Sequence, residues 1–197
     1  MKRLFTALKI IPDTGFTGKY RELRQSLRHE QIKWVEEHNI HITLKFFGDT
    51  EEQRIPAIGG VLRSISSSSP PVVLRLSGLG IFGSAYAPRV VWTGIEPYEE
   101  VAKLMKQVHE GLRPAGFEPD RQNLVPHLTL GRVKFLKDKI LFSRAIEQFK
   151  SISSLPITVG EIILYESILR REGPTYIALE KFPFEKKLHH EDKDTEC

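Results

Sequence analysis

The chain has 197 residues, 40% of them hydrophobic and 27% charged; this suits one globular domain or two small lobes sharing a core and excludes wholesale disorder. Lys and Arg number 29 against 25 Asp and Glu, a formal charge of +4 that permits an anionic partner such as RNA without requiring one. The single cysteine, Cys197, excludes an intramolecular disulfide and favours a reducing cytoplasm, and no apolar run has the length of a membrane span.

Hydrophobic patterns predict strands and amphipathic helices that alternate along the chain. Strands are expected at residues 3–11, 40–47, 72–78, 89–95, 125–134, 157–168 and 175–181. Helices are expected at residues 18–29, from the mid-fifties to about 65, at 98–112 and at 138–150. This interleaving predicts an α+β or mixed α/β class. We expect a single domain over residues 1–187, followed by a polar, disordered tail over 188–197.

One short pattern occurs twice. The motif His-x-Thr-Leu stands at His41–Leu44 and again 86 residues later at His127–Leu130, each time in a predicted strand. Because side chains alternate between the faces of a strand, the His and Thr of each copy share one face and the apolar residues face a core. Two copies indicate two related halves, and we expect both motifs to face one cleft.

Two imidazoles and two hydroxyls in one cleft match the needs of phosphodiester cleavage. A base must take a proton from the attacking water and an acid must protonate the leaving ribose oxygen, and imidazole suits both tasks near neutral pH. His41 and His127 are therefore the candidate catalytic pair, although their near-identical motifs leave acid and base unassigned. The hydroxyls of Thr43 and Thr129 and the guanidinium of Arg132 are candidate phosphate ligands.

Other candidates carry weaker signals. Phe47 shares the His41 face by parity and could stack on a base, with packing at the strand end as the alternative. Arg3 is expected on the surface or in the cleft. The run His189-His190-Glu191-Asp192 is expected to be a solvated part of the tail. No carboxylate lies in either motif and no Walker A loop is present, so neither a metal nor another cofactor is expected.

At these residues the chain resembles the two-histidine phosphoesterase superfamily and, within it, the RNA 2',3'-cyclic phosphodiesterases, also called 2'-5' RNA ligases. The resemblance extends from Arg3 to about Phe184 through the segments RLFTAL, IKWVEEHNIHITLKFFGD, PRVVWTGIE and PHLTLGR and through Tyr176 ahead of FPF. It implies a bilobed α+β fold in which two pseudo-symmetric antiparallel sheets flank a central cleft, with helices on the outside. It also implies cofactor-free hydrolysis of a 2',3'-cyclic phosphate to a 2'-phosphate.

The resemblance also assigns roles to the candidate residues. His41 corresponds to the general acid and His127 to the general base, while Thr43, Thr129 and Arg132 correspond to phosphate-binding positions. The same chemistry in reverse would join RNA ends through a 2'-5' linkage. We expect a cytoplasmic monomer, without a membrane, whose partners are RNA ends or nucleotides bearing a 2',3'-cyclic phosphate. The alternatives are a non-catalytic RNA or nucleotide binder and a phosphodiesterase for another small phosphoester.

Overall fold

Strands and helices alternate along the computed structural model, which describes residues 1–84, 86–119, 125–170 and 173–185. The strands are β1 (Lys2–Lys9), β2 (Gln31–Trp34), β3 (His41–Thr50), β4 (Val72–Ser84), β5 (Ala87–Glu96), β6 (Leu128–Phe135), β7 (Ile157–Val159), β8 (Glu161–Leu169) and β9 (Pro174–Pro183). The α-helices are α1 (Thr14–Ser26), α2 (Ile55–Ser67), α3 (Tyr98–Leu112) and α4 (Lys139–Gln148), and short 3-10 helices span Glu37–Asn39 and Glu52–Arg54. The predicted α+β class is confirmed, whereas the predicted tail over 188–197 lies outside the described residues.

The first helix differs from the sequence prediction for a local reason, and strand β2 differs from it for a long-range one. The first helix begins at Thr14, earlier than expected, because the Asp13 carboxylate accepts hydrogen bonds from the backbone N–H groups of Gly15 (2.8 Å) and Phe16 (3.1 Å) and so caps the helix. Strand β2 is not predicted, since its four residues offer too few positions for an alternating pattern and its place depends on pairing with β6.

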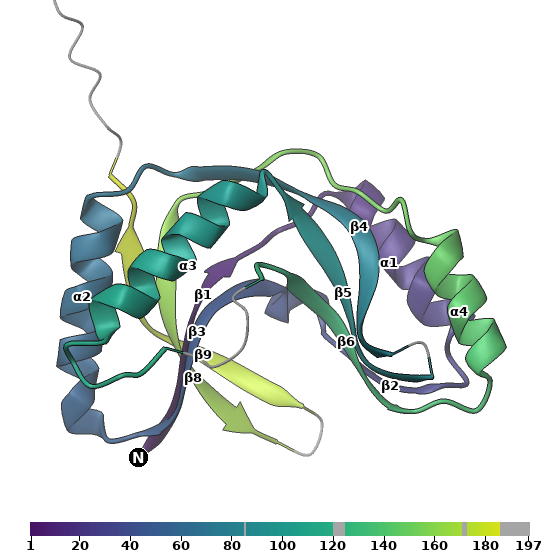
Figure 1. The fold of residues 1–197 in the computed structure, drawn as a ribbon, viewed down its shortest axis with the longest axis horizontal. Coiled ribbons are helices and arrows are strands. Elements are labelled where there is room, and N and C mark those ends of the chain that lie inside the picture. The colour runs from purple at the N-terminus through teal and green to yellow at the C-terminus, as the bar shows by residue number, and fades with distance from the viewer. Residues whose placement is uncertain (85, 120–124, 171–172, 186–197) are drawn as a thin grey trace, which may run out of the picture.

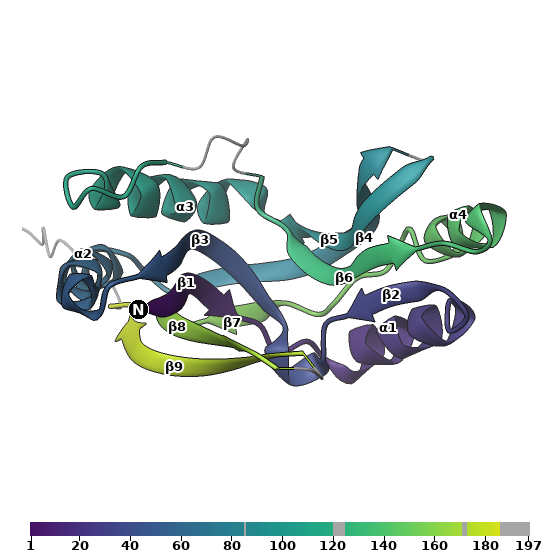
Figure 2. The ribbon, with the colours of Figure 1, turned by 90° about the horizontal axis from the view of Figure 1, so that it is seen from below.

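The sheet is antiparallel throughout the described chain and is continuous across its centre. Its strands follow the order β7-β4-β5-β6-β3-β1-β8-β9, and β2 pairs with β6. Between the central strands β6 and β3, the described residues form one pair, Ile42 with Leu128. The two predicted sheets are thus two halves of one curled sheet that meet at this pair (Figures 1 and 2).

Each half has its own pair of helices (Figure 1). We call β3, β1, β8 and β9 with α2 and α3 the β3 half, and β6, β5, β4, β7 and β2 with α1 and α4 the β6 half. An offset of 86 residues brings β1, α1, β3 and α2 onto β5, α3, β6 and α4 in turn. Helix α1 follows β1 of the β3 half but covers the β6 half, and helix α3 follows β5 of the β6 half but covers the β3 half. Each half is thus covered in part by a helix that follows a strand of the other.

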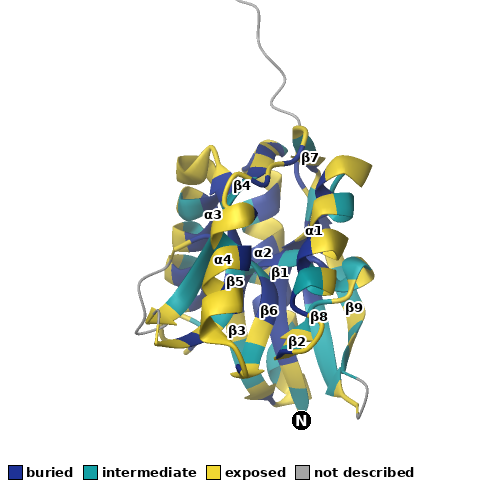
Figure 3. Ribbon diagram, turned by 90° about the vertical axis from the view of Figure 1, so that its right-hand side faces the viewer, coloured by how far each residue is buried: buried dark blue, intermediate teal, exposed yellow. Residues whose placement is uncertain are grey.

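Burial separates the two faces of the sheet. The helices present exposed residues outward and bury their inner faces against the strands (Figure 3). Examples are Tyr20 and Leu23 of α1 and Leu62 of α2, all fully buried. Within the described residues, none of the helices has both the length and the apolar character needed to cross a lipid bilayer. The helices thus cover one face of each half and leave the other face free for a site.

Candidate active site

The central pair of the sheet determines where the two motifs point. Ile42 and Leu128 are cross-strand partners and both are fully buried, so this pair faces the core. In a strand, the residues before and after a core-facing residue point to the opposite face. The His and Thr of both motifs therefore lie on the face that the helices leave open.

The register makes the two histidines diagonal neighbours. With Ile42 opposite Leu128, antiparallel pairing brings His41 opposite Thr129 and Thr43 opposite His127. Diagonal neighbours on one face of such a pair are about 7–8 Å apart, within reach of long and aromatic side chains. The two imidazoles thus flank a space of phosphate size, with one threonine beside each.

Hydrogen bonds orient both imidazole rings in the same way. His41 Nδ1–H donates to the backbone carbonyl of Asn39 (2.6 Å), and His127 Nδ1–H donates to that of Val125 (2.8 Å). Because a carbonyl only accepts, Nδ1 carries the proton in each neutral ring, and Nε2 is the nitrogen available for proton transfer. Neither Nε2 has a hydrogen-bond partner among the residues that the structure describes.

Aromatic rings hold each imidazole in place. The His41 ring lies 5.1 Å from the Phe5 ring and 5.3 Å from the Tyr176 ring, measured between centroids. The His127 ring packs edge-on against Phe82 at 4.7 Å and lies 6.5 Å from Trp92. None of Phe5, Phe82, Trp92 and Tyr176 is among the site residues expected from the sequence. The sequence alone does not tell whether an aromatic strand residue faces the cleft or the core, because that depends on the register of the strand.

The surroundings lower the pKa of both histidines. Burial is the main cause for His41, the charges of Arg132 and His127 add to it, and the hydrogen bond to Asn39 opposes it. Burial also lowers the pKa of His127, with the charge of Arg132 in support and the hydrogen bond to Val125 in opposition. The charge of Arg132 acts on both imidazoles and that of His127 acts on His41, which places the three side chains in one electrostatic neighbourhood.

A β-bulge falls on the last residue of each motif and changes the alternation. Leu44 is the extra residue where β3 pairs with β1, and Leu130 is the extra residue where β6 pairs with β5. Consequently the fifth residue after each histidine, Phe46 or Arg132, lies on the open face, where strict alternation would turn it inward. The bulges thus bring one aromatic ring and one guanidinium to related positions of the site.

Side chains from α1 and α3 bind the carbonyls of the two bulges. His109 Nε2–H of α3 donates to the carbonyl of Leu44 (3.0 Å). The Tyr20 hydroxyl of α1 lies 2.8 Å from the carbonyl of Leu130 and 2.7 Å from that of Val35. The Leu130 carbonyl also accepts a hydrogen bond from the backbone N–H of Val35 (2.8 Å), so the Tyr20 contact adds to backbone pairing at that bulge. The His109 contact gives the Leu44 carbonyl a buried side-chain donor.

The expectation that Phe47 faces the site is wrong, and the bulge at Leu44 is the reason. Phe47 packs against the Phe117 ring at 5.1 Å on the helix-covered side. Phe46, 54% exposed, lies on the site face instead, 5.7 Å from the Phe5 ring. The 86-residue offset between the two motifs could have identified Phe46 from the sequence, because it places Phe46, and not Phe47, at the position equivalent to Arg132.

The five remaining predicted residues come together on one face. His41, Thr43, His127, Thr129 and Arg132 surround the centre of the sheet. Neither threonine hydroxyl has a hydrogen-bond partner within the described parts of the chain, so both are available to a ligand. Gly131, which could have allowed close approach of a ligand, packs instead against β2, where a β-carbon would lie 2.7 Å from the Trp34 ring.

Fold and site together define a class. Paired strand histidines at the centre of a curled antiparallel sheet with helices outside are the arrangement of the two-histidine phosphoesterases. The model of the 2'-5' RNA ligase superfamily matches residues 13–170. The chain belongs to this superfamily.

Relatives and solved structures agree with that membership. The chain is 32% identical over 182 residues to an RNA 2',3'-cyclic phosphodiesterase of Methanothermobacter thermautotrophicus, covering 91% of this chain and 97% of the relative. It is 34% identical over 165 residues to one of Aeropyrum pernix, covering 82% and 93%. The crystal structure of TT0787 of Thermus thermophilus matches with a TM-score of 0.75 at 24% identity, covering 94% and 99%. E. coli LigT complexed with 3'-AMP matches with a TM-score of 0.66 at 20% identity, covering 93% and 97%.

Proposed function

We propose that the chain hydrolyses the 2',3'-cyclic phosphate at an RNA end to a 2'-phosphate, with His41 as general acid and His127 as general base. The observation that carries this proposal is the diagonal pair of imidazoles whose Nε2 atoms have no partner among the described residues and face one open side of the sheet. The names of the relatives support the reaction and the substrate class.

The proposed step uses only side chains of this site. Nε2 of His127 accepts a proton as the water oxygen bonds to phosphorus. The bond between phosphorus and O3' breaks, and protonated His41 Nε2 donates its proton to O3', which leaves a 2'-phosphate and a 3'-hydroxyl. A lowered pKa makes protonated His41 a stronger donor, and exchange with solvent restores both rings.

Charge that develops on the non-bridging oxygens needs donors nearby. The hydroxyls of Thr43 and Thr129 donate one hydrogen bond each, and the Arg132 guanidinium supplies a positive charge. Preorganised donors of this kind are worth about 10²–10³ in rate each. Attack by the 5'-hydroxyl of a second RNA in place of water would give a 2'-5' linkage at the same groups.

Substitution of each histidine tests the proposal. With EDTA-treated protein and a 2',3'-cyclic mononucleotide, His41→Ala and His127→Ala should each lower kcat by about 10²–10⁴. His29→Ala, at an exposed turn position, is the matched control and should retain the rate. Full activity in either site variant would refute the pair, and binding without turnover by the unsubstituted chain would indicate a nucleotide-binding module instead.

A change of leaving group separates acid from base. An aryl phosphodiester releases a phenolate that needs no proton, so His41→Ala should retain much of the unsubstituted rate on this substrate while His127→Ala does not. The opposite pattern, or a 3'-phosphate product from the cyclic substrate, would exchange the two roles. Preference for another phosphoester across a substrate panel would identify a phosphodiesterase of different specificity.

We also propose that the protein acts as a cytoplasmic monomer with residues 1–187 as its single domain. The single cysteine permits no internal disulfide, which supports a reducing compartment. Light scattering on eluted protein measures the mass, and a dimer would contradict this part. Truncation after residue 187 should leave the melting temperature unchanged.

A further inference from the structure

A groove of about 1020 Å³ opens beside the histidine pair. Phe5 and Tyr176, whose rings contact His41, and Arg132, whose charge acts on both histidines, belong to its lining. One wall comes from β2 and the segment after it, and the other from the ends of β8 and β9. The groove is therefore an extension of the site between the two halves.

Positive charge is concentrated along this groove. Its lining includes the cationic residues Arg3, Arg24, Lys33, Arg132, Lys134 and Arg170. The one carboxylate in the lining, Glu36, lies 3.3 Å from Arg24. The whole chain is nearly balanced, with 29 basic against 25 acidic residues, so the excess in the groove is local. Within the described parts of the chain, the other five cations have no ion-pair partner.

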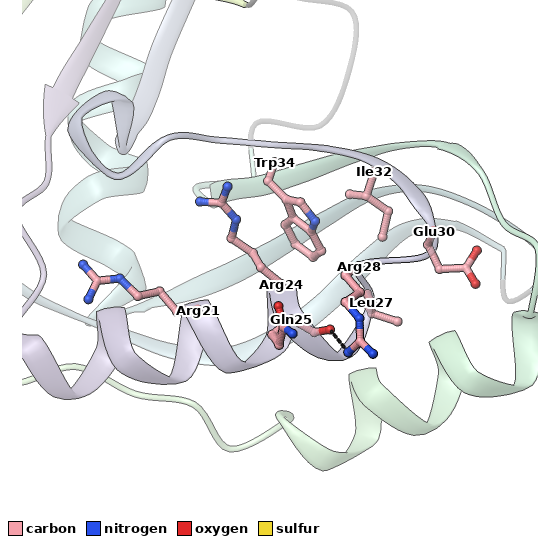
Figure 4. Close-up of a pocket in the computed structure, with 8 residues that line it drawn as sticks. All are labelled: Arg21, Arg24, Gln25, Leu27, Arg28, Glu30, Ile32 and Trp34. Atoms are coloured by element: carbon pink, nitrogen blue, oxygen red, sulfur yellow. Dashed lines mark hydrogen bonds between the residues drawn. The ribbon is translucent and has the colours of Figure 1, made fainter.

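Aromatic and aliphatic side chains accompany the cations. Phe46 is exposed on the groove, and Leu169, 69% exposed, stands near the end of β8. At Trp34 the groove adjoins a second pocket of about 380 Å³, with which it shares Arg24, Ile32 and Trp34. Figure 4 shows Trp34 and Ile32 extending from β2 toward α1, with the Arg24 side chain rising from α1 beside Trp34. Cations interleaved with rings are typical of surfaces that bind single-stranded nucleic acid.

The chemistry of the reacting end requires an exit for the rest of the chain. A 2',3'-cyclic phosphate uses both O2' and O3' of the last ribose, so an RNA chain can continue only from O5'. Lys134 lies two residues beyond Arg132 on β6, roughly 7 Å farther from His127. Lys33 on β2 reaches toward the other wall, where its Cε lies 3.9 Å from the position of a β-carbon on Gly173. These two lysines are placed past the reacting phosphate, where the next phosphodiesters would lie.

We propose that the groove binds the single-stranded RNA chain on the 5' side of the cyclic end, with Lys33 and Lys134 contacting its phosphodiesters. This inference rests on the proposed function, because it takes the reacting end to lie at the histidines. It makes an oligonucleotide, and not a mononucleotide, the substrate that the groove favours.

The double variant Lys33→Gln/Lys134→Gln tests the groove by comparing substrates. The measured quantity is the ratio of kcat/KM for a single-stranded octanucleotide ending in a 2',3'-cyclic phosphate to that for a cyclic mononucleotide. A contact to a single-strand phosphate contributes about 0.7 to the slope of log affinity against log salt, which is about fivefold at 0.1 M salt. Loss of two contacts should lower the ratio roughly 25-fold at 0.1 M salt and reduce the slope by about 1.4. Near 1 M salt the two proteins should be alike.

Lys103→Gln/Lys106→Gln is the control for charge. Both lysines are exposed on α3, which packs on the opposite face of β3, and their removal changes the net charge equally. This variant should keep the ratio and the salt slope. An equal fall in both double variants would indicate a general effect of charge and overturn the assignment of the groove.

A binding measurement separates this inference from the proposed function. Fluorescence anisotropy with a labelled octanucleotide ending in a 2'-phosphate reports on the groove even without turnover. Weaker binding by Lys33→Gln/Lys134→Gln alone supports the groove, whatever the catalytic result. Unchanged binding and slope, or equal affinity for a blunt RNA duplex, would overturn it.

Discussion

At the scale of single residues, the histidines and Arg132 form one electrostatic unit. Burial first, and the Arg132 charge in addition, lower the pKa of both imidazoles. An acid–base pair gives a bell-shaped pH profile whose limbs follow these two groups. Lowered pKa values move both limbs, and so the optimum, to lower pH than ordinary imidazoles would give.

Arg132→Gln should therefore shift the pH optimum upward while lowering kcat. Removing a positive charge favours the protonated form of both histidines, so each pKa rises, and loss of a phosphate donor costs about 10²–10³ in rate. Arg132→Lys keeps the charge and should keep the optimum, although it loses the fork geometry. The profile of kcat/KM against pH measures the shift, and an unmoved optimum in Arg132→Gln would exclude the electrostatic coupling.

The residue scale also shows what the sequence could predict. Side-chain alternation placed His41 with Thr43 and His127 with Thr129 on shared faces, as the register through Ile42 and Leu128 has them. The same alternation gave the wrong face for Phe47, which lies beyond the first motif. The bulge at Leu44 depends on pairing with β1 and on the His109 contact from α3. Such long-range contacts leave no periodic mark in a single sequence.

At the scale of elements, the β2–β6 pairing depends on a residue without a side chain. Strand β2 pairs with β6 from Gln31 to Trp34, and Trp34 lies opposite Gly131. A β-carbon on Gly131 would come within 2.7 Å of the Trp34 ring and 2.9 Å of Ile32 Cγ2, closer than carbon atoms pack. This close approach explains both the glycine after the second motif and the position of β2 beside Arg132.

Gly131→Ala should destabilise the fold by about 1–3 kcal/mol, because Trp34 and β2 must move. Gly60→Ala is the matched control, since Gly60 lies inside α2 with nothing within 4 Å of the added carbon. It should stabilise the protein by roughly 0.5–1 kcal/mol through helix propensity. Urea unfolding measures both, and a neutral Gly131→Ala would show that β2 is not held by this contact.

At the scale of the whole molecule, the two halves are interleaved along the chain. After β1 the chain crosses to the β6 half for α1 and β2, returns for β3 and α2, and crosses again for β4 and β5. Helix α3 then covers the β3 half, β6, α4 and β7 complete the other half, and β8 and β9 close the first. Neither half is a continuous segment, so neither can be completed without the other, and we expect one cooperative unfolding transition.

The tryptophans make that expectation measurable. Both of them, Trp34 and Trp92, lie in the β6 half, whereas the fully buried Leu62 lies in α2 of the β3 half. Leu62→Ala should cost about 2–5 kcal/mol, and each kcal/mol should lower Tm by about 2–4 °C in a chain of this size. Because both halves unfold in one transition, the midpoint temperature measured by tryptophan fluorescence, which reports on the distant half, should fall by the same amount as the midpoint measured by far-ultraviolet circular dichroism. A fluorescence midpoint that stays in place while the dichroism midpoint falls would mean that the halves unfold separately, and a site built between them would then be lost with either half alone.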